Sequence, residues 1–323
     1  MVTLGSIACD YDLQRDDTLV VGLVNNMPDA ALRATERQFS DLLSAGARNR
    51  SIRLRLFFLP GIPRGRDAQA FLSDRYEDIS QLWGSRVDGL IVTGTEPRAH
   101  LLSEEPYWPF FARLVDWTES HTVSTLWSCL AAHAAVLRLD GINRRRFAQK
   151  LFGLFDCSKV SDHPIVDSAP SRWQVPHSRY NDLPEEELVA CGYRILSRAA
   201  DAGADMFVSH RQSLFVFTQG HPEYDADTLL REYRRDVQRY LSGARDTYPE
   251  IPRGYFDQAT FSKLDAFRQH AARRRDSELM DDFPVVPMAS VGAWRQVAVD
   301  LYTNWLSYLA DQISTERGVH LAR

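Results

Sequence analysis

Cys129 is the residue whose surroundings best suit nucleophilic chemistry. It follows a stretch at residues 123–127 that is expected to be a strand, and it stands directly before a helical pattern at 130–139. A strand that turns sharply into a helix lifts the side chain at the junction out of the sheet, and the helix N-terminus favours a thiolate and supplies free backbone N–H groups. A buried structural cysteine could occupy the same junction, so Cys129 alone leaves both interpretations open.

His221 and Glu223 could provide the base that such a thiol needs. They lie in Gly-His-Pro-Glu at residues 220–223, directly after an apolar run at 214–217. The carboxyl ends of strands are where open α/β folds bind ligands. A thiol nucleophile needs a base, and the base needs a partner that orients it. A lone His-x-Glu pair is weak evidence, but together with the strand–cysteine–helix unit it predicts a Cys-His-Glu site.

The elements that would position these residues alternate between strands and helices. Short apolar runs predict strands at 19–24, 52–58, 90–92 and 123–127. Apolar stripes of helical period predict helices after residue 29, up to residue 83, at 107–120 and at 130–139. Asp29 is expected to be a helix N-cap, and the alternating run at 52–58 is expected near a sheet edge. This order predicts an α/β fold: a parallel sheet with right-handed crossovers and helices on both faces.

The second half of the chain has a less regular pattern. Residues 141–200 are rich in charge and proline and predict irregular structure with some short strands. Residues 206–208 and 214–217 predict a hairpin. Further expectations are a helix at 225–241, a surface-wrapping segment at 242–290 and a last helix at 291–313. Residues 1–17 and 314–323 are expected to be tails on one domain, residues 18–313.

The composition narrows the functional classes. The chain has 323 residues, 44% of them hydrophobic and 25% charged, and a net charge of −5, which gives no overall electrostatic case for nucleic acid. The basic runs at 144–146 and 273–275 are expected to be solvated, although one could steer an anionic cofactor such as coenzyme A. No apolar run reaches the roughly 18 residues that span a bilayer, and no signal pattern opens the chain, so a cytoplasmic protein without a membrane partner is expected. The four cysteines show no metal-binding spacing, and no metal is expected.

Ordered sequence blocks across residues 18–313 resemble a known family. The most specific are Pro-His-Ser-Arg-Tyr at 176–180 and Gly-His-Pro-Glu-Tyr-Asp at 220–225, and Asn-Met-Pro at 26–28 and Asn-Trp-Leu at 304–306 lie near the two ends. In these blocks the chain resembles the homoserine O-acyltransferases of the MetA type, which acylate homoserine for methionine biosynthesis. The resemblance implies a flavodoxin-like sheet of the class I glutamine amidotransferase kind, a Cys-His-Glu triad and a homodimer.

The resemblance also implies a ping-pong mechanism. Acyl-coenzyme A would acylate Cys129 as a substrate, with no bound cofactor, and His221, oriented by Glu223, would then deprotonate the hydroxyl of homoserine. The oxyanion would be held by backbone N–H groups of Leu130 and of a residue near Thr95.

Four further residues receive substrate-binding roles from the resemblance. Lys150 would line the acyl site, and Ser178 would contact substrate. Glu232 and Arg235 would hold the ammonium and carboxylate of the amino acid. Their i, i+3 spacing places both on one helix face, as a zwitterion requires, although a surface ion pair would have the same spacing.

The chain departs from the family pattern around this site. Arg98 stands at the position expected to select the acyl donor, and an arginine could pair with the carboxylate of a succinyl group. Leu130 replaces a tryptophan, His133 a glutamine and Gln219 a threonine. We expect homoserine O-succinyltransferase activity. The alternatives are acetyl transfer, a serine acceptor, or a hydrolase or glutaminase that uses the same triad.

Overall fold

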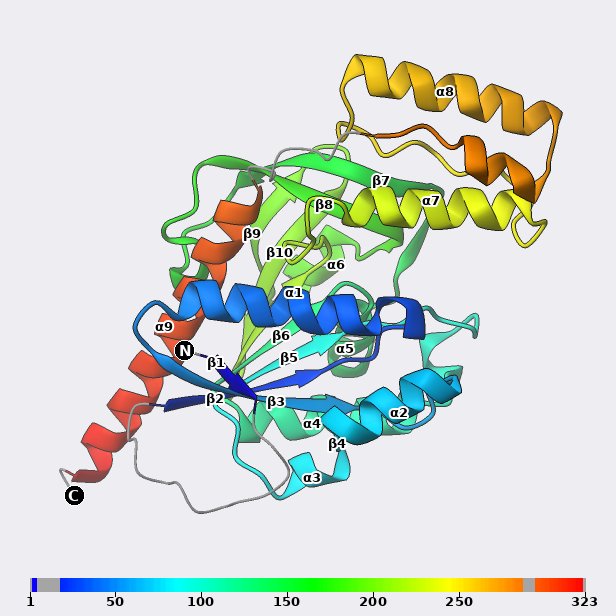
Figure 1. Cartoon of the computed structure of the whole chain (residues 1–323). Helices are drawn as coiled ribbons and strands as arrows, with labels where there is room; N and C mark the ends of the chain where they lie inside the picture. Colours follow the sequence, from blue (N-terminus) through cyan, green and yellow to red (C-terminus); the bar gives the residue numbers. More distant parts are fainter. Residues whose placement is uncertain (1, 5–17, 287–293, 322–323) are drawn as a thin grey trace.

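The protein is built around one mixed sheet. The computed structural model describes residues 2–4, 18–286 and 294–321, and eleven strands within them form the sheet (Figure 1). Its first half is parallel, in the order β1 (Val2–Leu4), β3 (Ser51–Phe58), β2 (Thr18–Val24), β5 (Gly89–Thr93), β6 (Ser124–Ser128) and β11 (Leu214–Thr218). The short β4 (Glu77–Asp78) also pairs with β3. The strands predicted in the first half of the sequence are therefore confirmed.

The second half of the sheet is antiparallel. It continues from β11 through β10 (Gly203–His210) and β9 (Arg194–Ala199) to β7 (Arg145–Lys159) and β8 (Arg172–Asp182). The hairpin of β10 and β11 was predicted correctly, but the prediction of irregular structure at 141–200 was wrong. Much of β7 is exposed and a register shift between Arg146 and Leu151 interrupts its pairing, so the period-2 pattern of a strand is weak there.

Helices cover both faces of the sheet, as predicted. One apolar cluster joins the sheet to α1 (Asp29–Ala47), α2 (Arg66–Arg75) and α9 (Trp294–Leu321), and a second joins the opposite face to α4 (Trp108–His121) and α5 (Leu130–Asp140) (Figure 1). Strands β5, β6 and β11 are buried along their whole length, which explains the apolar runs of β5 and β11, and the hydroxyl of Ser124 in β6 is satisfied by the Leu214 carbonyl. The remaining short helices are α3 (Ser80–Trp83), α6 (Glu185–Ala190), η1 (Leu102–Glu104) and η2 (Pro164–Val166).

A third apolar cluster forms at the β7 side of the molecule. It joins α7 (Thr228–Leu241), α8 (Gln258–Arg273) and η3 (Ser277–Asp282), which form a helical layer beside β7 (Figure 1). The segment expected to wrap the surface at 242–290 is therefore more ordered than predicted, up to residue 286. The layer is joined to the sheet by a backbone bridge between Gly153 and Arg253.

Three predictions at the chain ends and at α1 were wrong. Residues 2–4 form strand β1 rather than part of a tail, and α9 continues through residues 314–321. Residues 5–17, 287–293 and 322–323 lie outside the described structure. Asp29 does not cap α1, whose N-cap is Pro28; its carboxylate instead accepts the Gly65 N–H at 2.7 Å and contacts Arg64 at 3.2 Å. No helix among the described residues is long and apolar enough to cross a membrane.

Gly153 provides a test of how the helical layer is attached. Its φ is +136°, and a Cβ there would lie 2.2 Å from the backbone oxygen of Arg253. We expect Gly153→Ala to lower the free energy of unfolding by about 3 kcal/mol, because the left-handed backbone and the clash act together. Gly192→Ala is the matched control, since Gly192 has a φ of +85° but nothing within 4 Å of its Cβ position. It should cost about 1 kcal/mol. If urea unfolding gives the same loss in free energy of unfolding for both variants, the close contact of Gly153 with Arg253 does not contribute to stability.

Candidate active site

Three parallel strands end in the same row and so bring the predicted site together. Thr93 of β5 pairs with Ser128 of β6, and Ser128 pairs with Thr218 of β11. The residues that follow each strand therefore meet at one edge of the sheet. These are the Gly94–Thr95 backbone, Cys129 at the start of α5, and the loop that contains His221.

Cys129 occupies a strained turn between β6 and α5. Its φ of +52° and ψ of −113° are unfavourable for a residue with a Cβ, and the side chain is partly exposed. The backbone N–H of Cys129 donates to the Thr218 carbonyl at 2.7 Å, which ties the turn to the neighbouring strand. A sharp, non-glycine turn at a strand–helix junction is the geometry of a nucleophile elbow, so the position predicted for the nucleophile has the expected backbone.

His221 is held from both sides in a buried position. Its Nδ1 lies 2.8 Å from Oε1 of Glu223, and its ring stacks on Tyr224 with 4.2 Å between ring centroids. The His221 backbone N–H donates to the Pro176 carbonyl at 2.8 Å. The His221 side chain is also hydrogen-bonded to Cys129. Since Glu223 occupies Nδ1, Nε2 is the nitrogen left for the thiol.

The electrostatics of His221 are set by its two partners. Burial alone would lower the pKa of the imidazole, but the negative charges of Cys129 and Glu223, and the hydrogen bonds to both, outweigh it and hold the pKa well above the ordinary histidine value. The imidazole therefore favours its protonated form. A thiolate–imidazolium pair is the reactive form of a cysteine nucleophile.

The predicted substrate-binding residues form a second, contiguous cluster on β7, β8 and α7. The carboxylate of Glu232 accepts hydrogen bonds from the Ser178 hydroxyl and, at 2.6 Å, from the Tyr224 hydroxyl. Lys150 Nζ lies 3.6 Å from Glu232. Burial would raise the pKa of Glu232, but Lys150 and the two hydroxyl donors outweigh it and lower the pKa, so the carboxylate is ionised.

Arg235 lies next to this cluster, and its anchor was not predicted from the sequence. Its guanidinium donates twice to Oδ1 of Asp236, at 3.0 and 3.1 Å, and Lys150 lies 3.5 Å from the other oxygen of the same carboxylate. The buried Asp236 thus links the two cations. Asp236 was missed because its only sequence signal is its place next to Arg235.

Gly94, which precedes the expected oxyanion donor Thr95, packs against the other expected donor, Leu130. A Cβ at Gly94 would be 3.0 Å from the backbone nitrogen of Leu130 and 2.6 Å from its Cβ, so the backbone at 94–95 packs directly on the first turn of α5. The first N–H groups of a helix have no partner within the helix. Thr93 anchors the neighbouring strand end, because its hydroxyl accepts the Asn26 N–H at 2.8 Å.

Arg98 lies farther out. Its side chain is exposed, and its backbone N–H, together with that of Ala99, donates to Oε1 of the buried Glu105. The preceding Glu96 lies 3.6 Å from Arg239 of α7. Arg98 therefore sits on a loop that is fixed through its backbone, with its side chain directed away from the protein interior.

His133 and Gln219, two departures from the family pattern, contact each other. His133 Nε2 lies 2.8 Å from Oε1 of Gln219, across a sequence separation of 86 residues. Gln219 in turn donates to the Ala204 carbonyl at 2.6 Å and accepts the Leu183 N–H at 3.1 Å. The two substitutions thus form one buried link between the nucleophile helix and the strand that delivers His221.

A buried cluster of Cys157, His177 and Asp205 lies next to Gly220, the residue that precedes His221. Donor atoms of Cys157, His177 and Asp205 lie within 4.8 Å of one another, an arrangement that could suit a metal ion. Burial raises the pKa of the Cys157 thiol, which keeps it in the protonated form that is a poor metal ligand. The oxygens of Asp205 accept the Ser197 hydroxyl at 3.0 Å and the Gly220 N–H at 3.2 Å. The cluster is therefore better explained as a support for Gly220.

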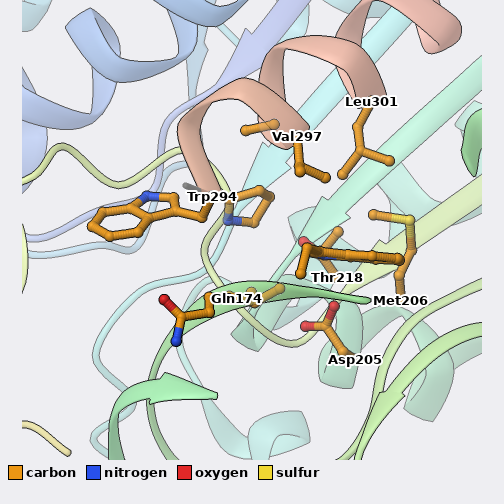
Figure 2. A pocket seen from close by; sticks show the side chains of 11 residues that line it. Gln174, Asp205, Met206, Thr218, Trp294, Val297 and Leu301 are labelled. Carbon is orange, nitrogen blue, oxygen red and sulfur yellow. The ribbon is translucent and has the colours of Figure 1, made fainter. Parts of the chain in front are cut away.

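A small cavity lies behind this cluster, between the sheet and α9. Figure 2 shows Trp294, Val297 and Leu301 of α9 facing Asp205, Met206 and Thr218 of the sheet. Its volume is about 10 Å³, close to that of one water molecule. It is too small for a substrate.

The sequence comparisons identify similar proteins. The family model for homoserine O-succinyltransferase matches residues 10–316. A homoserine O-succinyltransferase from Methylorubrum extorquens is 47% identical over 313 residues, which cover 96% of this chain and 92% of the relative. One from Rhodopseudomonas palustris is 49% identical over 294 residues, which cover 90% of this chain and 88% of the relative. The family match includes every residue of the site described above.

A comparison of folds gives the same architecture. A glutamine amidotransferase from Methylobacillus flagellatus aligns over 90% of this chain and 95% of its own, with a TM-score of 0.50 and 12% identity. At that identity the similarity concerns the fold alone. It confirms the expected flavodoxin-like α/β class of the class I glutamine amidotransferases.

His133 makes the stability of the protein depend on pH. Burial, and then the positive charges of Arg179 and Arg144, lower its pKa to about 3. An unfolded histidine titrates near 6.5, so the stability due to neutral His133 is complete above about pH 6.5 and is lost as the pH falls toward about 3. Between about pH 7.5 and about pH 5, we expect the free energy of unfolding of the wild type to fall by about 2 kcal/mol more than that of His133→Gln, as measured by urea unfolding.

His163 and His177 serve as internal controls in this comparison. Burial lowers the pKa of both, but both are present in the wild type and in the variant, so their contributions cancel. If the difference in free energy of unfolding between the wild type and His133→Gln does not change with pH, His133 is not a neutral, buried histidine.

Proposed function

Since the chain belongs to the homoserine O-succinyltransferase family, we propose that it transfers a succinyl group from succinyl-coenzyme A to the hydroxyl of homoserine through a thioester on Cys129. One observation carries this mechanism: Cys129 stands on a strained strand–helix turn, hydrogen-bonded to His221, whose Nδ1 lies 2.8 Å from Glu223. The proposed activity belongs to methionine biosynthesis, as the family resemblance implies.

In the first half-reaction the Cys129 thiolate attacks the thioester carbonyl of the donor. The developing oxyanion is proposed to accept hydrogen bonds from the backbone N–H groups of Leu130 and Thr95, since the 94–95 backbone packs on the start of α5. Collapse of the tetrahedral intermediate forms the acyl-Cys129 thioester and releases coenzyme A, whose thiolate takes the proton from His221. No resident cofactor takes part in this scheme, and acyl-coenzyme A enters as a substrate.

The second half-reaction uses the change in charge at Cys129. A thioester carries no negative charge, so acylation removes the foremost influence that raises the pKa of His221. The imidazole then loses its proton more readily and can accept one from the homoserine hydroxyl, while Glu223 keeps Nδ1 oriented. The attacking oxygen displaces the thiolate of Cys129, which recovers its ion pair with His221.

Homoserine is proposed to bind at the Glu232 cluster. The ionised Glu232 can receive the ammonium group, and Ser178 lies against the same carboxylate. Arg235 spends two of its five N–H donors on Asp236 and is 41% exposed, which leaves donors for the carboxylate of the substrate. Lys150, between Glu232 and Asp236, holds the two acidic groups in place and is proposed to line the acyl site.

Three further features of the proposal concern the donor, the assembly and the compartment. Arg98 is proposed to influence the choice of donor, which is supported by its exposed side chain on the loop after β5. A homodimer and a cytoplasmic location are proposed from the family resemblance.

The thioester can be tested by intact mass. Mixed with succinyl-coenzyme A alone, the protein is expected to gain the mass of one succinyl group, because the acceptor needed for the second half-reaction is missing. Cys129→Ser should gain no thioester, whereas Cys191→Ser, which alters an exposed cysteine, should behave as the wild type. An acetyl adduct from acetyl-coenzyme A in place of a succinyl adduct would favour the acetyl alternative. The absence of any adduct would refute the thioester mechanism.

The acceptor site can be tested by kinetics. Glu232→Gln removes the charge proposed to hold the ammonium group, so we expect the KM for homoserine to rise by about 10- to 100-fold. Acylation of Cys129 by the donor alone should change little. Glu187→Gln, an exposed change on α6, is the control for removal of a carboxylate. Equal losses in both half-reactions would contradict a specific role in acceptor binding.

A further inference from the structure

Two buried donor groups near the nucleophile have no hydrogen-bond partner. They are Nη1 of Arg144, in the link between α5 and β7, and the hydroxyl of Tyr107, at the start of α4. A buried donor without a partner costs roughly 1–3 kcal/mol, and more when it is charged. Each such group needs a partner to offset this cost, which an ordered water or a bound ligand can supply.

Electrostatic interactions link the two groups to each other, and link Arg144 to the catalytic end of α5. The charge of Arg144 interacts with Tyr107 and Glu105, and also with Cys129 and His133 of the nucleophile turn. Burial lowers the pKa of the Arg144 guanidinium, and Tyr107, Glu105 and Cys129 act against this lowering. An arginine stays protonated in proteins under such conditions, so Arg144 places a half-buried cation beside the nucleophile.

No carboxylate among the described residues satisfies this cation. Glu105 is the nearby acid, but its Oε1 accepts the backbone N–H groups of Arg98 and Ala99, and no ion pair joins it to Arg144. The neighbouring Arg145 is exposed and pairs with Glu186 at 3.0 Å. The basic run at 144–146 was expected to be solvated, and for Arg144 this was wrong.

We propose that Arg144, together with the Tyr107 hydroxyl, binds the free carboxylate of the succinyl group carried on Cys129. A planar guanidinium with an unpaired, buried Nη1 matches a carboxylate in shape and charge. A succinyl group differs from an acetyl group by a short chain that ends in such a carboxylate. The phosphates of coenzyme A lie a whole pantetheine arm from the thioester, so a cation that interacts with Cys129 meets the acyl end. The inference rests on the proposed succinyl transfer and names the group that would bind the succinyl carboxylate, which leaves the exposed Arg98 an influence from the loop after β5.

The test compares two donors with four-carbon acyl groups, of which succinyl carries a terminal carboxylate and butyryl does not. For Arg144→Gln we expect kcat/KM with succinyl-coenzyme A to fall about 10- to 100-fold, the loss of a charge-assisted hydrogen-bond pair, while kcat/KM with butyryl-coenzyme A stays the same or rises. Tyr107→Phe removes only the unpaired hydroxyl and should lower the succinyl rate several-fold with no effect on butyryl transfer. Arg145→Gln is the matched control in the same basic run and should leave both rates unchanged.

Three outcomes would overturn the inference, and they separate it from the proposed function. Equal losses on both donors in Arg144→Gln and Tyr107→Phe would show a structural role only. A succinyl-selective loss in Arg98→Gln but not in Arg144→Gln would assign the carboxylate to Arg98. A wild-type protein that takes no succinyl group would refute the proposed function and this inference together, whereas the first two outcomes leave succinyl transfer intact. Thermal unfolding of each variant, with Arg144→Lys as a charge-preserving replacement, distinguishes misfolding from loss of recognition.

Discussion

The common register of β5, β6 and β11 is the constraint on which the site depends. Thr93, Ser128 and Thr218 lie in one row, so the chain leaves three neighbouring strands at the same height and its next residues converge. All three strands are buried on both faces, and a one-residue slip would exchange the side chains that each strand presents to the two apolar layers. The packing of the core therefore fixes the distance between Cys129 and the His221 loop, which lie far apart in the sequence.

Around this edge, charge is compensated by short, buried contacts. Lys150 lies between Glu232 and Asp236, and Glu223 accepts from His221, so these four side chains and His221 form compensated pairs, in contrast to the unpaired Arg144. Removing one partner of such a pair leaves the other uncompensated in a medium of low dielectric. The ion pairs of Lys150 therefore hold α7 against β7.

The sequence was sufficient to predict the parallel half of the sheet and the Cys129–His221–Glu223 arrangement, because apolar runs and the residues after them carry a local signal. It was not sufficient for β7, because several of its residues are exposed and its pairing is interrupted, so its sequence lacks the alternating pattern of a strand. Nor could it show that His133 meets Gln219, since that contact depends on tertiary packing. Arg144 belongs to a basic run of the kind that is usually solvated, and only the tertiary structure shows that its Nη1 is buried.

The helical layer of α7 and α8 has a consequence for how the two substrates can be recognised. Glu232 and Arg235 belong to a helix with its own apolar cluster, whereas Cys129 and Arg144 flank α5, which packs on the main sheet. Changes in one cluster need not disturb the packing of the other. If the acceptor binds at Glu232 and the donor beside Arg144, as proposed, the two ends of the reaction can evolve separately: substitutions in the layer beside β7 would alter the acceptor, while the donor end, embedded in the central core, is retained.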